Sequence, residues 1–201
     1  MAGMLVPLAH WICQRMLDGS PDGYSEIALL GVGMQWFNAI MFLPAVAGRV
    51  VLPILTGCVT NENSADSRRL LLLAMRSNAF ITFPMAVVIA ILSRWILSLY
   101  GPSFAGGSPV LAIAVFTAAL LAVQSPVGNM VVAASRMWLG MLMNVGWAAV
   151  YIGLTFWTIA YGAMGVTIAM CCAYIVHSIW TFVFVVRQLH SLDMTTAKKG
   201  T

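Results

Sequence analysis

Arg49 lies inside a long apolar stretch, between Pro44 and Pro53 in the run FLPAVAGRVVLPIL, residues 42–55. A charged side chain is costly in hydrocarbon, and a proline removes a helical hydrogen bond. A guanidinium that faces a wet cavity can bind an anionic group, such as a phosphate, through paired hydrogen bonds. Arg49 is therefore the first candidate for a residue that contacts a substrate.

Gln35 and Asn38 share a helical face with Arg49, because successive residues of a helix are about 100° apart. Polar residues of a membrane helix face a protein interior or a wet cavity rather than lipid. Alternatively, Arg49 snorkels to the headgroups or pairs with another helix. Nine residues follow it before the next polar loop, which is about 13 Å of helix for a side chain to cover. Both interpretations remain open.

Polar side chains also recur on one face of each of three later apolar segments. One such stripe alone is typical of helix–helix contacts, whereas four together favour a shared polar cleft. His177, beside the last stripe, is either a proton relay or a packed polar group. We predict that the following residues line a substrate cavity: Gln35, Asn38, Arg49, Gln124, Asn144, Tyr151 and Tyr174.

The apolar segments contain no Asp or Glu, and the chain has no nucleophile elbow, HExxH motif or phosphate-binding loop. We therefore expect no enzyme, no catalytic residues, and neither a metal nor another cofactor. A carrier coupled to protons or sodium usually needs a carboxylate in its path. A cationic cleft without acids fits an anionic cargo, such as a phosphate-bearing lipid.

Composition places the chain in a membrane, because 61% of its 201 residues are hydrophobic and only 8% are charged. The mean hydropathy is +0.93, whereas soluble domains carry about 25% charged residues. The apolar runs do not alternate as barrel strands do, so we predict an all-α polytopic protein. The six predicted transmembrane helices span about 2–17, 27–58, 70–99, 109–134, 137–160 and 165–186, and we expect Pro84 to break the third of them.

Charges in the connecting loops predict the orientation. The first loop, 18–26, carries three acids, whereas Arg68, Arg69 and Arg136 lie in the second and fourth loops. Basic loops face the cytoplasm, so both termini are expected there, with 190–201 as a disordered tail. Membrane topology explains the basic residues, and no nucleic-acid partner is expected. We expect no signal peptide, because the N-terminus lacks a basic leader.

Four stretches resemble one family of transporters. GVGMQWFNAIMFLPAVAGRVVLPIL resembles the eighth span of the Wzx-type polysaccharide flippases, which belong to the multidrug/oligosaccharidyl-lipid/polysaccharide exporter superfamily. ILSLYGPSFAGGSPVLAI resembles their next periplasmic turn. PVGNMVVAASRMWLGMLMNVGWAAV and YGAMGVTIAMCCAYIVHSIW resemble their tenth to twelfth spans. The resemblance covers roughly residues 5–188 and depends on Gly, Pro, Trp and Asn rather than on a catalytic signature.

The resemblance implies the C-terminal six-helix lobe of a transporter in the bacterial inner membrane. Such proteins move undecaprenyl-diphosphate-linked oligosaccharide between leaflets, without hydrolysing ATP, for O-antigen and lipopolysaccharide, capsule or exopolysaccharide synthesis. Arg49 is then the candidate ligand for the pyrophosphate. Expected partners are this lipid-linked substrate, membrane lipids, and a second six-helix lobe from a separate chain or a second copy.

Other functions remain open at this point. A drug or metabolite exporter of the same superfamily would be expected to carry an acidic residue in its cavity. A membrane acyl- or glycosyltransferase would need clustered acids or histidines, whereas His10, His177 and His190 are scattered along the sequence. A truncated remnant without transport activity is the last alternative.

Overall fold

The computed structural model describes residues 2–19, 22–60 and 64–199, and this part of the chain is helical apart from short turns, which confirms the all-α part of the predicted fold class. Short 3₁₀ helices η1 (Pro102–Gly107) and η2 (Ile159–Tyr161) interrupt the long helices. The α-helices are α1 (Ala2–Asp18), α2 (Gly23–Thr60), α3 (Ser64–Tyr100), α4 (Ser108–Ala133), α5 (Met137–Thr158) and α6 (Gly162–Lys199).

Four segments are long and apolar enough to cross a membrane: Gly23–Thr60, Ala65–Tyr100, Pro102–Ala133 and Met137–Phe184. The last segment contains α5 and most of α6, which are separated by η2 and a turn at Gly162. Helix α1 has 17 residues, about 26 Å, which is shorter than a hydrocarbon core of about 30 Å. The protein is therefore a polytopic helical membrane protein, and the number of six spans stays a prediction.

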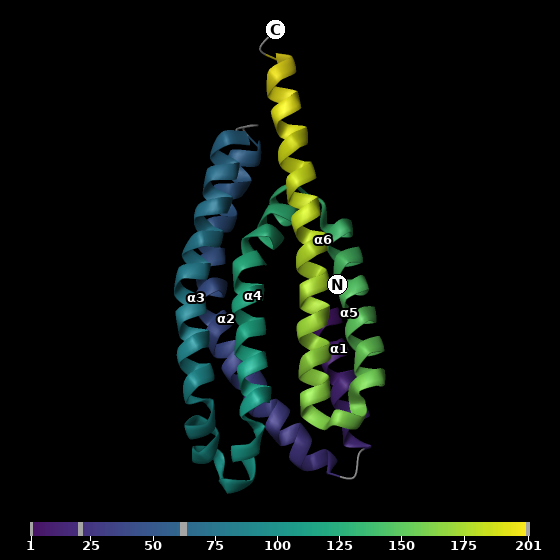
Figure 1. The fold of residues 1–201 in the computed structure, drawn as a ribbon. Helices are drawn as coiled ribbons and strands as arrows, with labels where there is room; N and C mark the ends of the chain where they lie inside the picture. The colour runs from purple at the N-terminus through teal and green to yellow at the C-terminus, as the bar shows by residue number, and fades with distance from the viewer. Residues whose placement is uncertain (1, 20–21, 61–63, 200–201) are drawn as a thin grey trace.

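The helices form an elongated bundle in which α2, α3 and α4 lie together and α1, α5 and α6 lie together (Figure 1). Helix α4 joins the two groups, since it packs against α2, α3 and α6. A large apolar core surrounds residues such as Leu111, Trp147 and Met170. A smaller core, which includes Leu55, Met130 and Phe184, lies toward the end where α4 turns into α5.

The two ends of this bundle differ in charge, although Asp66 lies near the arginines of one end and Arg94 lies toward the other. The α2–α3 and α4–α5 junctions lie at the same end (Figure 1), where the sequence places Arg68, Arg69 and Arg136. The opposite end carries the α1–α2 junction and η1. This second end is called the acidic end because it carries Asp18, Asp22 and Glu26. Arg15, a basic residue at that acidic end, is paired with Asp18, with Nη1 3.0 Å from Oδ2.

A carboxylate ties the N-terminus of α6 to α2 at the acidic end. The backbone N–H of Ala163 donates a hydrogen bond of 2.6 Å to Oε2 of Glu26. Gly162 precedes it with φ of 61°. A negative charge at a helix N-terminus satisfies a free N–H group and interacts favourably with the helix dipole. The contact joins residues that are far apart in sequence.

Two predictions about local structure are wrong. Pro84 was expected to break the third span, but α3 continues across it from Ser64 to Tyr100. Transmembrane helices tolerate proline because neighbouring groups can satisfy the carbonyl that it frees. Residues 190–201 were expected to be disordered, but α6 continues to Lys199, and residues 200 and 201 lie outside the described part of the chain. No proline or glycine lies between Val166 and Lys199 to stop this helix.

Candidate binding pocket

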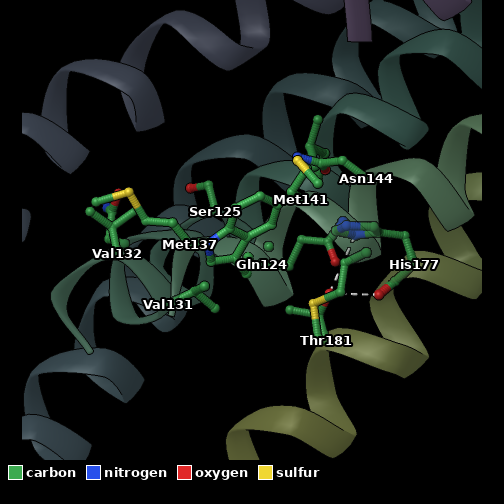
Figure 2. Close-up of a pocket in the computed structure, with 15 residues that line it drawn as sticks. Gln124, Ser125, Val131, Val132, Met137, Met141, Asn144, His177 and Thr181 are labelled. Atoms are coloured by element: carbon green, nitrogen blue, oxygen red, sulfur yellow. Dashed lines mark hydrogen bonds between the residues drawn. The ribbon is translucent and has the colours of Figure 1, made fainter. Parts of the chain in front are cut away.

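A cavity of about 730 Å³ lies between α4, α5 and α6, in the half of the bundle near the α4–α5 turn (Figure 2). Its size falls within the range of small-molecule sites. Most of the wall is apolar and includes Met137, Met141 and Val132. The polar side chains in the wall are Gln124, Ser125, Asn129, Asn144, His177 and Thr181.

The structure therefore brings together polar residues from three of the predicted stripes. Gln124 comes from α4, Asn144 from α5, and both His177 and Thr181 from α6. The described lining residues include no Asp, Glu, Lys or Arg. The cavity is consequently an uncharged site with amide, hydroxyl and imidazole groups.

Gln124 has an unusual environment for a polar side chain. It is only 8% exposed, and neither Oε1 nor Nε2 has a hydrogen-bond partner among the described residues. Leaving a buried donor or acceptor unpaired costs about 1–3 kcal/mol for each group. Such a group in a pocket wall is therefore available to a ligand that offers both donors and acceptors.

His177 lies on the α6 side of the pocket beside Thr181. The Thr181 hydroxyl donates a 2.6 Å hydrogen bond to the backbone carbonyl of His177. The same Oγ1 lies 3.3 Å from Nδ1 of the imidazole. These contacts place His177 as a packed polar group with one edge at the pocket, and its role as a proton relay stays a prediction.

Asn78 of α3, which sequence reasoning missed, holds α4 at the turn that carries Gln124. Pro126 has no N–H, so the carbonyl of Ala122 loses its usual helical donor. Asn78 Nδ2 donates to that carbonyl at 2.8 Å and contacts Oγ of Ser125 at 3.3 Å. An asparagine inside an apolar run was the available signal, but its partner could not be read from the sequence.

Tyr151 and Tyr174, both predicted to line a cavity, lie in the large core and do not line this pocket. They are 1% and 6% exposed, respectively. Their rings pack against Trp147, with centroid distances of 5.4 Å for Tyr151 and 5.0 Å for Tyr174. His10 of α1 approaches the Tyr151 ring at 5.2 Å. This cluster joins α1, α5 and α6.

Gln35, Asn38 and Arg49 lie on an exposed face of α2 and do not line this pocket either. Gln35 Oε1 accepts a 3.2 Å hydrogen bond from the Tyr100 hydroxyl. The predicted stripes are therefore divided between an inner pocket at α4, α5 and α6 and an outer stripe on α2. Whether Arg49 contacts a substrate stays a prediction.

The His, Cys, Asp and Glu side chains are the candidate metal ligands of this chain. Within residues 2–19, 22–60 and 64–199, no three of them come close enough together to hold a metal ion. The cysteines Cys13, Cys58, Cys171 and Cys172 are unpaired thiols. The described polar groups of the pocket are suited to hydrogen bonding.

Two known proteins that are similar to this chain are both named for polysaccharide export. Over 168 residues the chain is 27% identical to the EPS I polysaccharide export inner membrane protein EpsE of Ralstonia nicotianae (strain ATCC BAA-1114 / GMI1000). A protein of the same name from Ralstonia solanacearum is 27% identical over 169 residues. Each match covers 82% of this chain and 38% of the relative, so the chain spans well under half of these relatives. No family model and no solved structure matches the chain.

Proposed function

We propose that this chain is a membrane lobe of a bacterial polysaccharide exporter, which translocates undecaprenyl-diphosphate-linked oligosaccharide across the inner membrane. The observation that carries the proposal is the similarity over 82% of the chain to inner membrane proteins named for polysaccharide export. A highly apolar, all-helical chain with candidate membrane spans is the kind of scaffold that such transport requires.

The lobe is proposed to consist of six membrane helices, α1 to α6. The segment Met137–Phe184 supports this number, because it holds two helices joined by a turn at Gly162. Helix α1 packs against α5, and its His10 reaches the aromatic cluster, so α1 is an integral part of the bundle. Placing the basic junctions in the cytoplasm puts both termini there.

A second six-helix lobe, from a separate chain or a second copy, is proposed to complete the transporter. The α2 stripe with Gln35, Asn38 and Arg49 is exposed in the lobe described here. A polar stripe of this kind is costly against lipid and is favoured where it faces a protein or a wet cleft. Transporters built from two lobes bind their substrate between them and expose it to each side in turn.

The transporter is proposed to bind its cargo through the anionic diphosphate and the sugars of that cargo. Arg49 would contact the diphosphate, because a planar guanidinium pairs well with phosphate oxygens. The carrier would have no chemical step of its own. This distinguishes it from an acyl- or glycosyltransferase, which needs positioned acid–base or nucleophilic groups.

The test is disruption of the gene in its source bacterium, followed by complementation with the intact gene. Disruption should reduce surface or secreted polysaccharide and raise the cellular pool of lipid-linked oligosaccharide, and complementation should reverse both changes. Normal polysaccharide combined with increased sensitivity to toxic compounds would instead support a drug or metabolite exporter. Unchanged polysaccharide and an unchanged precursor pool would contradict the proposal.

A further inference from the structure

The wall of the pocket between α4, α5 and α6 contains a buried polar side chain without hydrogen-bond partners among the described residues. Gln124 is only 8% exposed, so its side chain is more than nine-tenths buried. Both of its amide atoms lack a hydrogen-bond partner among the described residues. A primary amide offers two donors on nitrogen and an acceptor on oxygen. A ligand that matches it must therefore carry donors and acceptors side by side.

The other groups of the wall narrow the chemistry of that ligand. Asn144 lines the pocket from α5, so amides reach it from different helices. No charged side chain is found among the described lining residues. A diphosphate placed there would be a poorly compensated buried charge, which is strongly disfavoured. The pocket is thus suited to an uncharged part of a ligand.

A polyprenyl or acyl chain fits the pocket less well than a sugar does. It would fill the apolar wall but would leave both polar atoms of Gln124 unpaired, at continuing cost. Sugar hydroxyls both donate and accept, and the carbon–hydrogen faces of a sugar ring can pack on apolar walls. Trp138, which lines the pocket and is 80% exposed, supplies an aromatic surface.

We propose that this pocket binds an uncharged sugar unit of the exported glycan, with the Gln124 amide pairing with sugar hydroxyls. This inference rests on the proposed function and adds a sugar subsite inside one lobe, separate from the α2 stripe. Figure 2 shows Gln124, Asn144 and His177 around the pocket, on three different helices. Hydroxyl groups of the bound sugar would supply the hydrogen bonds that the Gln124 amide lacks.

Binding by the full chain in lipid nanodiscs tests the proposal. The probe is the oligosaccharide released by mild acid from the lipid-linked pool of the source bacterium, and undecaprenyl phosphate is the sugar-free comparison. Gln124→Leu keeps a side chain of similar size but removes its hydrogen-bonding atoms. It should weaken oligosaccharide binding about tenfold and leave undecaprenyl phosphate binding unchanged.

Gln14→Leu is the matched control, because Gln14 lies on α1 and does not line the pocket. It should leave oligosaccharide affinity unchanged. Thermal unfolding gives a second readout. Gln124→Leu should unfold at the same or a higher temperature, since it removes an unpaired buried amide. Asn144→Leu, which changes the wall formed by α5, should also weaken oligosaccharide binding, by about threefold to tenfold.

Unchanged oligosaccharide affinity in Gln124→Leu would overturn the sugar subsite, as would equal losses for oligosaccharide and undecaprenyl phosphate. The second result would identify the pocket as a site for the lipid chain. Gene disruption separates these failures from failure of the proposed function. If disruption abolishes polysaccharide export while Gln124→Leu binds sugar normally, the exporter stands and only the subsite is lost.

Discussion

Arg49 extends from the exposed face of α2, beside Gly48, which itself faces Asn129. No ion pair joins the Arg49 guanidinium to another described residue. At the residue scale, the two explanations for Arg49 differ in what they require. A substrate contact requires an anionic cargo, whereas a snorkelling side chain requires only headgroups.

In cells that carry the complete transporter, Arg49→Ala should reduce polysaccharide export severalfold while membrane levels of the protein stay near normal. Arg49→Lys should restore part of the activity, because lysine keeps the charge but loses the planar fork. Export is measured as polysaccharide per cell, and protein by immunoblot of membranes. Full export by Arg49→Ala would leave snorkelling as the explanation.

Asn78 provides a residue-scale prediction about stability. Asn78→Ala removes one of two side-chain donors to the Ala122 carbonyl, the other being the Ser125 hydroxyl at 3.0 Å, so unfolding should become easier by about 1 kcal/mol. Thermal unfolding of the purified chain in nanodiscs measures this change. Asn38→Ala, on the exposed face of α2, is the control and should shift unfolding very little. Equal effects of both substitutions would show that the Asn78 contact is not special.

At the scale of elements, the start of α6 depends on a turn that only a glycine fits well. Gly162 has φ of 61°, and a Cβ there would lie 2.5 Å from Oε2 of Glu26. A side chain at this position would therefore be strained and would also push against the carboxylate that caps Ala163. The link between α2 and α6 should be sensitive to changes at either residue.

Gly162→Ala should lower the unfolding temperature measurably, because it combines a positive φ with a clash at Glu26. Gly153→Ala is the matched control. Gly153 lies within α5, where an added Cβ meets nothing within 4 Å, so alanine should be neutral or slightly stabilising. Thermal unfolding of both variants in nanodiscs decides the point. A Gly162→Ala variant as stable as the wild type would contradict the role given to this turn.

The sequence predicted elements better than it predicted contacts between them. Long apolar runs place the helices, so the fifth helix was expected at 137–160 and α5 is observed as Met137–Thr158. Proline breaks and the tail were predicted less well, because local propensity cannot show which neighbour satisfies a freed carbonyl. The Glu26–Ala163 and Asn78–Ala122 hydrogen bonds join residues that no periodicity connects.

For the candidate site too, the sequence predicted some residues well but not the contacts between helices. Periodicity selected Gln124 and Asn144, which the structure brings to one pocket. It also selected Tyr151 and Tyr174, which the structure places in the aromatic core, since a polar hydroxyl on a large ring suits both environments. Helical periodicity gives the direction of a side chain around its own axis but not the helix that lies opposite.

At the scale of the whole molecule, Arg68, Arg69 and Arg136 lie at the end of the bundle with the α2–α3 and α4–α5 junctions, and the positive-inside rule predicts that this end faces the cytoplasm. A reporter enzyme active only in the cytoplasm should therefore be active when fused after Thr201. A reporter active only in the periplasm should be active when inserted near η1, in the loop between α3 and α4. The reverse pattern would contradict the proposed orientation.

The whole-molecule proposal is that this lobe takes part in moving a lipid-linked glycan between leaflets. The most direct measurement is the distribution of lipid-linked oligosaccharide between the cytoplasmic and periplasmic leaflets, in cells depleted of this chain. Depletion should trap the oligosaccharide in the cytoplasmic leaflet, and re-expression should return it to the periplasmic leaflet. An unchanged distribution between the leaflets after depletion would contradict translocation by this protein.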